Sequence, residues 1–320
     1  MLTPRENFIR YLKNEDYAWT PSNVDQLAFR PTLIGDNVAR AMVAEQEKYT
    51  GSFGGKDLFG VEWVFEPSVG GSMEVGHLFD DIEDWEQYVQ FPDVDQLDWE
   101  GCAKANAEYL NTDKLVQSTI FTGLFERLIS YVGFENAAMA LIDEDQKEDV
   151  HKIFQGLTEV YIKLIRNMHR YFNVELVEFH DDWGTQRDTM FSAATLQEMI
   201  LPYLKQIVDA AHEEGVFIEL HSCGKIDSFI PYVIEVGVDT WRGQANVIDK
   251  MGLVQRYGDQ FKFCVEIRPA APMPKDELLA FADEIIGQCR GKRVWLGLAR
   301  LLAGDMRDAL YAHVREIGVV

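Results

Sequence analysis

The sequence predicts an α/β protein with the fold of a (β/α)8 TIM barrel. Short apolar runs alternate with amphipathic helical segments through the whole second half of the chain, and such alternation implies parallel strands. A chain of 320 residues without a Gly-x-Gly-x-x-Gly fingerprint favours a closed barrel over an open sheet. No Pro-, Gly- or Ser-rich linker interrupts the pattern. We therefore expect a single domain over residues 1–320, with an N-terminal helical and hairpin elaboration.

The first half of the chain contains this elaboration. Thr3, Pro4 and Glu6 form the capping-box pattern that starts a helix. Residues 17–21 are a candidate first strand. The stretch 51–76 is rich in glycine and aromatic residues but lacks a phosphate-loop pattern, so it is expected to be a hairpin insertion that covers a pocket.

The remaining elements follow from apolar periodicity. From residue 82 to 109 the pattern is helical, with an interruption at Phe91-Pro92-Asp93. Strands are expected at residues 115–122, 174–180, 217–224, 240–243, 261–267 and 293–298. Helices are expected at residues 126–141, 146–171, 195–214, 229–236, 248–257, 275–289 and 305–317.

Composition limits the classes of partner. The chain has 53 acidic and 30 basic side chains, a formal net charge of −23. A field of this sign repels nucleic acid and anionic lipid. No signal peptide or membrane-spanning run is evident, and four scattered cysteines do not form a disulfide framework. These features predict a cytoplasmic protein with reduced thiols.

A His-x-Cys-Gly sequence at residues 221–224 ends the apolar run that starts at Phe217. Side chains alternate along a strand, so His221 and Cys223 are expected on one face at its C-terminal end. Imidazole nitrogen and thiolate sulfur both suit zinc. The alternative is a hydrogen-bonded histidine beside an inert thiol.

Barrel enzymes place their reacting groups where strands end. His180 and Asp182 share a strand face and, with Gln244, are the candidate catalytic residues. Arg242 near Gln244 needs a partner if it points into the barrel. The other predicted strand ends are 119–122, 264–268 with Cys264, Glu266 and Arg268, and 297–300 with Arg300.

Several motifs together resemble the uroporphyrinogen decarboxylase superfamily, and within it the branch of cobalamin-dependent methyltransferases. The motifs are Asp181-Asp182-Trp183-Gly184-Thr185-Gln186, a helix with Pro202, His221-Ser222-Cys223-Gly224, Gly237-Val238-Asp239 with Gln244, and Tyr257-Gly258-Asp259. The resemblance implies a (β/α)8 barrel. In the methyltransferase branch it also implies a zinc ion on the His-x-Cys pair and a later cysteine, acting on a methyl group carried to or from a corrinoid (cobalamin) protein.

The later cysteine does not carry over. Residues 297–300 contain no thiol, and Cys289 belongs to the preceding helix. The expected metal ligands are therefore His221, Cys223 and Glu266, with Cys264 as the rival of Glu266. No second domain is long enough to hold a corrinoid, so a partner protein is expected to supply it.

The reaction expected from the resemblance is transfer of a methyl group from a small methylated substrate to that corrinoid. An aryl methyl ether is one candidate, since Trp19, Phe53, Phe59, Trp63 and Trp183 could line an aromatic site. Tetrapyrrole decarboxylation is disfavoured because residues 19–31 offer only Arg30 to hold propionate groups. A barrel that has lost metal and methyl transfer is the remaining alternative.

Overall fold

The computed structural model describes residues 2–68, 71–244, 246–299, 302 and 304–319. The chain divides into two compact units. The central unit comprises residues 28–111 and 116–238, and the terminal unit comprises residues 1–27, 112–115 and 239–320. The single domain over residues 1–320 stays a prediction, because each unit is compact by itself.

Parallel strands form the middle of the central unit. They are β5 (Leu115–Ile120), β6 (Leu176–His180) and β7 (Phe217–Ser222), paired in chain order. All six residues of β5 are buried, as expected for a strand covered on both faces. Helices separate the strands along the chain, so β6 and β7 end on the same side.

Most helices of the central unit lie in or near the predicted ranges, but α2 (Gly35–Ala39) was not predicted and the helical pattern at 82–109 consists of five short segments. The helices are α2, η1 (Ile82–Asp84), α3 (Trp85–Tyr88), η2 (Val94–Gln96), α4 (Trp99–Ala105), α5 (Ala107–Leu110), α6 (Leu124–Val132), α7 (Phe134–Ala140), α8 (Lys147–Phe172), α9 (Ala193–Thr195), η3 (Leu196–Ile200), α10 (Leu201–Glu213), η4 (Asp227–Phe229) and α11 (Ile230–Val236).

Two further helices differ from the sequence prediction. The helix expected at 126–141 breaks at Gly133, whose φ of 80° only glycine adopts readily. The helix expected at 195–214 contains the π-helical segment η3 just before Pro202. Proline has no N–H to donate to the preceding turn, so a change in the hydrogen-bond pattern at this point is understandable.

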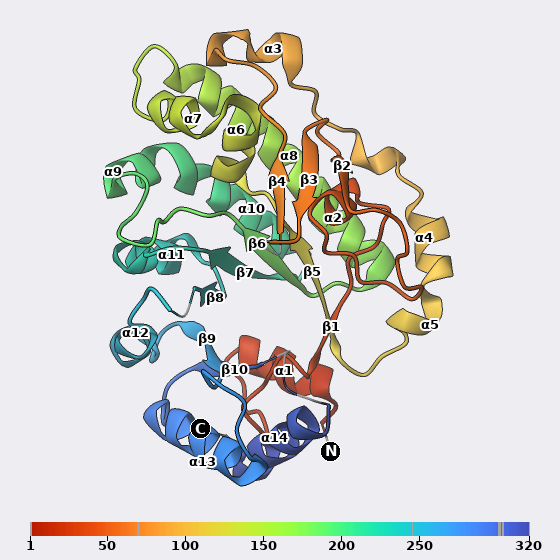
Figure 1. Ribbon diagram of the computed structural model, residues 1–320, viewed down its shortest axis with the longest axis vertical. Helices are drawn as coiled ribbons and strands as arrows, with labels where there is room; N and C mark the ends of the chain where they lie inside the picture. The colour runs from red at the N-terminus through yellow and green to blue at the C-terminus, as the bar shows by residue number, and fades with distance from the viewer. Residues whose placement is uncertain (1, 69–70, 245, 300–301, 303, 320) are drawn as a thin grey trace. The chain divides into compact units, whose positions relative to one another are not determined.

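The antiparallel insertion is confirmed, and its role in covering a pocket stays a prediction. Strands β2 (Gly54–Lys56), β3 (Glu62–Glu66) and β4 (Gly71–Glu74) form an antiparallel three-stranded sheet in the central unit (Figure 1). It packs against α2. Trp63 of β3 is buried, and its indole N–H donates to Asp57 Oδ2 at 2.8 Å. Arg127 of α6 donates to the same Asp57 carboxylate, which ties the sheet to the helix that follows β5.

The terminal unit repeats the same alternation. Its elements are α1 (Pro4–Leu12), most of β1 (Gln26–Ala28), β8 (Thr240–Gly243), α12 (Lys250–Tyr257), β9 (Lys262–Ile267), α13 (Lys275–Gln288), β10 (Val294–Leu298) and α14 (Gly304–Ile317). Strands β8, β9 and β10 pair in parallel and in chain order. Ser22 bridges Leu296 in parallel, so the segment before β1 pairs with the edge of β10.

The start of the chain confirms one prediction and corrects another. The capping box of α1 is present, with the Glu6 amide donating to Thr3 Oγ1 at 3.1 Å. The strand expected at residues 17–21 is wrong, and β1 lies at Gln26–Ala28 instead. Asn7 uses its side-chain amide to bind the Trp19 carbonyl and the Ala18 N–H, both at 2.8 Å. These bonds satisfy backbone groups that a strand would have paired.

Strands that are consecutive in the chain are neighbours in each unit, parallel, and separated by helices. This is the topology of the TIM-barrel class, so the predicted fold class is confirmed. None of the helices among the described residues is long and apolar enough to cross a membrane.

Candidate metal centre

Four side chains converge where β6 and β7 end. His180, Asp182, His221 and Cys223 each offer one potential ligand atom, and these atoms all lie within 4.8 Å of one another. All four residues belong to the central unit and are half-buried. The cluster thus lies at the strand ends where barrel enzymes place their chemistry.

The register of the two strands explains the pairing of the histidines. His180 is the partner of His221 across the β6–β7 ladder, and their rings stack 4.5 Å apart at an interplanar angle of 5°. His221 Nε2 lies 3.4 Å from Cys223 Sγ. The prediction that His221 and Cys223 come together is confirmed as geometry.

Two glycines let the loops after these strands touch. Gly224 has a φ of 78°, and a Cβ built on it would clash with the backbone of Gly184. In turn, a Cβ on Gly184 would lie 2.8 Å from Lys225 N. The Lys225 N–H donates to the Thr185 carbonyl at 2.8 Å. The glycine that follows Trp183 and the glycine that follows Cys223 therefore form one close backbone contact.

Hydrogen bonds then fix Asp182 and Cys223 relative to each other. The Cys223 N–H donates to Asp182 Oδ1 at 2.5 Å. Ser222 Oγ accepts from the Trp183 N–H at 2.9 Å and donates to the Cys223 carbonyl at 3.0 Å. The middle residue of the His-x-Cys motif thus connects both loops.

His180 is held by a carboxylate from another element. Its Nδ1 lies 2.8 Å from Oε2 of Glu126, in the first turn of α6, and both side chains are 15% exposed. Burial acts against an imidazolium, but the Glu126 carboxylate outweighs it and raises the pKa of His180 well above its usual value. Burial also acts against the Glu126 carboxylate, yet attraction to His180 lowers its pKa.

The thiol of Cys223 is subject to opposing effects. A hydrogen bond with His180 lowers its pKa, but burial and the Asp182 carboxylate outweigh this bond and leave the pKa raised. A free Cys223 is therefore a thiol at neutral pH. A divalent cation deprotonates a coordinating thiol outright.

The donor set fits a zinc ion. Two imidazole nitrogens, one sulfur and one carboxylate oxygen are all zinc ligands. Tetrahedral zinc with bonds of about 2.0–2.3 Å places its ligand atoms roughly 3.3–3.8 Å apart. The 3.4 Å between His221 Nε2 and Cys223 Sγ lies in that range.

The sequence interpretation of this cluster was incomplete. The strand pattern predicts His180 and Asp182 as catalytic residues, whereas their positions also make them candidate ligands beside His221 and Cys223. It does not single out Glu126. A carboxylate soon after the end of a predicted strand, where Glu126 follows Thr122 and Gly123, was the available signal.

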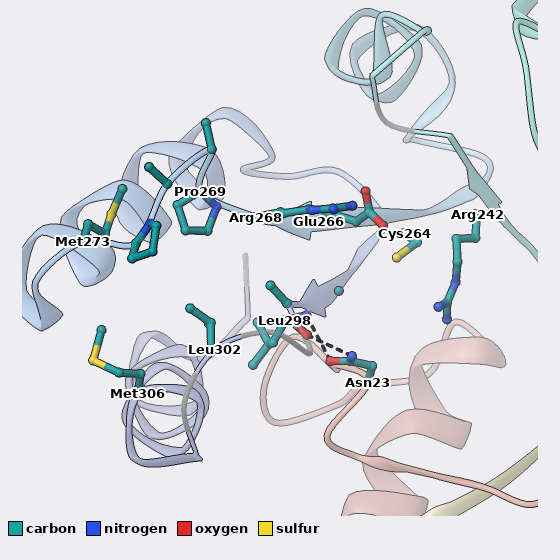
Figure 2. A pocket seen from close by; sticks show the side chains of 15 residues that line it. Asn23, Arg242, Cys264, Glu266, Arg268, Pro269, Met273, Leu298, Leu302 and Met306 are labelled. Carbon is teal, nitrogen blue, oxygen red and sulfur yellow. Dashed lines mark hydrogen bonds between the residues drawn. The ribbon is translucent and has the colours of Figure 1, made fainter. Parts of the chain in front are cut away.

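The other predicted residues belong to the terminal unit. Glu266 and Cys264 line a cavity of about 790 Å³ together with Arg242, Arg268 and Met306 (Figure 2). A Cβ on Gly297 would lie 3.1 Å from Glu266 Cγ and 3.2 Å from Cys264 Sγ, so both side chains face the same way, as predicted. Their roles as metal ligands stay predictions, as does catalysis by the half-buried Gln244.

Cys289, the remaining cysteine considered as a metal ligand, packs in the core. Cys289 is buried, and its sulfur lies 3.9 Å from the sulfur of Met251. Burial raises the pKa of Cys289 to about 11, so it is a poor source of thiolate. Arg300, at the last predicted strand end, lies outside the described residues.

The aromatic candidates serve largely as core. Trp19, Phe59, Trp63 and Trp183 are buried. Trp63 packs under Arg40 and Phe59 packs under Arg127, with guanidinium-to-ring distances of 4.4 and 4.2 Å. An aromatic substrate wall built from these rings stays a prediction.

Comparison with protein families matches the region that contains the cluster. A family model described as uroporphyrinogen decarboxylase (URO-D) matches residues 121–260. The predicted superfamily resemblance is confirmed. The matched range includes Glu126, His180, Asp182, His221 and Cys223. No curated protein matches the sequence.

Comparison with solved structures extends the fold over the whole chain. A methyltransferase from Methanosarcina mazei aligns over 99% of this chain and 99% of its own, at 16% identity and a TM-score of 0.67. Two xylanases align less well. One from Gloeophyllum trabeum covers 69% of this chain and 81% of its own at 10% identity with a TM-score of 0.44, and xylanase B from Clostridium stercorarium F9 covers 63% and 72% at 11% identity with 0.39.

Proposed function

We propose that the protein is a zinc-dependent methyltransferase that moves a methyl group from a small methylated substrate to a corrinoid held by a partner protein. The observation that carries the proposal is the cluster of two imidazoles, a thiol and a carboxylate at the ends of β6 and β7. The superfamily match and the fold of the Methanosarcina mazei methyltransferase support the reaction class.

The ligand set begins with His221 and Cys223, as the sequence predicts. His180 and Asp182 are the nearest candidates to complete it, and Glu266 stays a competing third ligand. When bound, zinc supplies a Lewis acid that polarises a substrate oxygen or lowers the pKa of a substrate thiol. The Asp182 side chain is 26% exposed, against 15% for His180. Asp182 would therefore be the more readily replaced of these two donors if a substrate oxygen bound the metal.

The methyl transfer itself balances as a nucleophilic displacement. The bond between the methyl carbon and the donor oxygen breaks, and the reduced cobalt of the corrinoid contributes the electron pair of the new carbon–cobalt bond. The donor leaves as an alcohol or phenol after gaining a proton. Where they do not bind the metal, Asp182 and His180 are the residues that we assign to holding that proton. We assign Gln244, whose amide can only donate or accept hydrogen bonds, to orienting the donor group.

The substrate is assigned only by class. A methyl ether would use the Lewis-acid role of the metal, and a methyl thiol would use its effect on sulfur. An aryl methyl ether remains the first donor to test.

Tetrapyrrole decarboxylation is less compatible with the chain. Arg30, the only basic residue at 19–31, is 8% exposed and its Nε donates to the Met42 carbonyl at 2.7 Å. A guanidinium used in this way is a poor grip for propionate groups.

The test is a methyl-transfer assay on protein whose zinc content has been measured. Reduced free cobalamin or a corrinoid protein is mixed with methoxyaromatics, methylamines and methyl thiols, and the cobalt spectrum is followed. We expect methylcobalt to form with at least one donor. Zinc-loaded protein that forms none with every donor would contradict the methyltransferase assignment and favour a barrel with other chemistry or none.

A further inference from the structure

We propose that Glu126 is a positioning residue of the metal centre, and that Arg40 holds Glu126 for this task. Glu126 would orient His180 so that its Nε2 is presented to the metal. The inference rests on the proposed function in one respect only, that the cluster of His180, Asp182, His221 and Cys223 binds zinc.

The position of Glu126 is fixed by the start of α6. The backbone N–H groups of Leu124, Phe125 and Glu126 donate to the buried Asp181 carboxylate, at 3.1, 3.2 and 2.9 Å. Asp181 is the residue after His180, and its own N–H donates to the His221 carbonyl at 3.0 Å. The first turn of α6 is therefore anchored to the strand ends that carry the cluster.

The contact with Glu126 decides which nitrogen of His180 faces the cluster. An ionised carboxylate only accepts hydrogen bonds, so the 2.8 Å contact places a proton on Nδ1. Nε2 then points toward the cluster, 3.8 Å from Asp182 Oδ1. A carboxylate that fixes the tautomer and orientation of a ligating histidine strengthens metal binding.

Arg40 supplies the charge that this arrangement needs. Its Nη2 lies 3.7 Å from Glu126 Oε1, its Nη1 donates to Thr122 Oγ1 at 2.8 Å, and its guanidinium lies 4.4 Å over the Trp63 ring. A neutral, metal-bound imidazole no longer offers Glu126 a full positive charge. A buried carboxylate without a cation is costly, so Arg40 keeps Glu126 ionised and in place.

The hairpin insertion thereby takes part in the metal centre. Trp63 belongs to β3 and is itself held by Asp57. Direct side-chain contacts within the central unit connect Trp63 to Arg40, Arg40 to Glu126, and Glu126 to His180. None of Trp63, Arg40 and Glu126 offers the metal a ligand atom in the cluster, so their effect on zinc would be indirect.

The experiment measures zinc affinity by chelator competition, and the absorption of the Co²⁺-substituted protein, in Glu126→Gln and Arg40→Met. Glu126→Gln is expected to bind zinc about 10- to 100-fold more weakly than the wild type, with a changed Co²⁺ spectrum. Arg40→Met is expected to lose less zinc affinity than Glu126→Gln. Glu148→Gln, an exposed carboxylate in the first turn of α8, is the matched control and should bind as the wild type does.

A double variant separates positioning from general damage to the fold. Since Arg40 acts through Glu126, Glu126→Gln with Arg40→Met should bind zinc within about twofold of Glu126→Gln alone. Circular dichroism of the zinc-free proteins checks folding, and Arg40→Lys, which keeps the charge, should bind more tightly than Arg40→Met.

The outcomes separate this inference from the proposed function. Wild-type protein that binds neither metal contradicts the zinc centre and this inference together. Zinc-binding wild-type protein with equal affinity in Glu126→Gln, or losses that multiply in the double variant, overturns the inference alone. If the variants lose zinc affinity as expected but the zinc-loaded wild type transfers no methyl group, only the methyltransferase assignment is overturned.

Discussion

Gly224 carries the tightest backbone contact near the candidate metal centre. It follows Cys223 directly, has a φ of 78°, and has no room for a Cβ against Gly184. Cys223 and Asp182 reach each other because their loops touch at these two glycines. The absence of a Cβ at Gly224 thus allows the Cys223 thiol and the Asp182 carboxylate to lie close together.

We predict that Gly224→Ala weakens both folding and zinc binding. An alanine with this φ is strained by about 1–3 kcal/mol, and the clash with Gly184 adds to that cost. Gly215→Ala is the matched control, because Gly215 also has a φ of 78° but no atom within 4 Å of the added Cβ. Urea unfolding and zinc titration compare the two. Equal losses in both variants would refute a role for the Gly184 contact.

At the scale of one strand, β9 combines a buried cation with the cavity residues of the terminal unit. Lys262 is 6% exposed, and its carbonyl accepts from the Thr240 hydroxyl at 3.1 Å on β8. Burial lowers the pKa of Lys262 from 10.5 to about 8, although the charge of Asp239 acts in the opposite direction. Two residues along, Cys264 lines the cavity shown in Figure 2.

This lysine predicts a dependence of stability on pH. Because its folded pKa lies below its unfolded pKa, the unfolded chain binds more protons between pH about 8 and about 10.5. The contribution of Lys262 to the free energy of unfolding should therefore rise with pH across this window, by on the order of 3 kcal/mol.

The measurement compares Lys262→Met with the wild type by urea unfolding at several pH values. The free energy of unfolding of Lys262→Met, relative to the wild type, should be greatest below pH about 8. This difference should shrink as the pH rises toward about 10.5. Lys275→Met, at an exposed position in α13, controls for loss of one positive charge. A constant difference between wild type and Lys262→Met would contradict the buried charge.

At the scale of the whole molecule, metal binding is expected to change the stability of the folded chain. A ligand that binds only the folded state stabilises it by about 2.7 kcal/mol when its free concentration is roughly 100 times its Kd. The net charge of −23 also favours a bound cation. All four cluster residues come from the central unit, so the metal is expected to stabilise that unit first.

We predict that zinc raises the melting temperature of the wild type and that EDTA reverses the effect. Cys223→Ser should lose both the bound zinc and the thermal shift while keeping its fold. Cys102→Ser, also a free cysteine of the central unit but outside the cluster, should keep both. X-ray absorption of the wild type should count one sulfur on the metal, whereas two would favour Cys264 as a ligand. Full zinc content in Cys223→Ser would contradict the assigned site.

Features that depend on neighbours in the chain can be predicted from the sequence alone. The two-residue period of a strand places His221 and Cys223 on one face, and the capping box of α1 needs only Thr3 and Glu6. Helix and strand ranges of the second half follow from local periodicity for the same reason. The barrel class follows because alternating elements permit few topologies.

Features that depend on strand register and on contacts between distant segments become visible only in the folded chain. The pairing of β6 with β7 stacks His180 on His221, and the start of α6 brings Glu126 to His180 across 54 residues of chain. The bonds from Asn7 to residues 18 and 19 displaced the strand expected at 17–21. Local periodicity does not predict such contacts, because the residues next to Glu126 or Asn7 in the sequence do not show which distant residue each will contact.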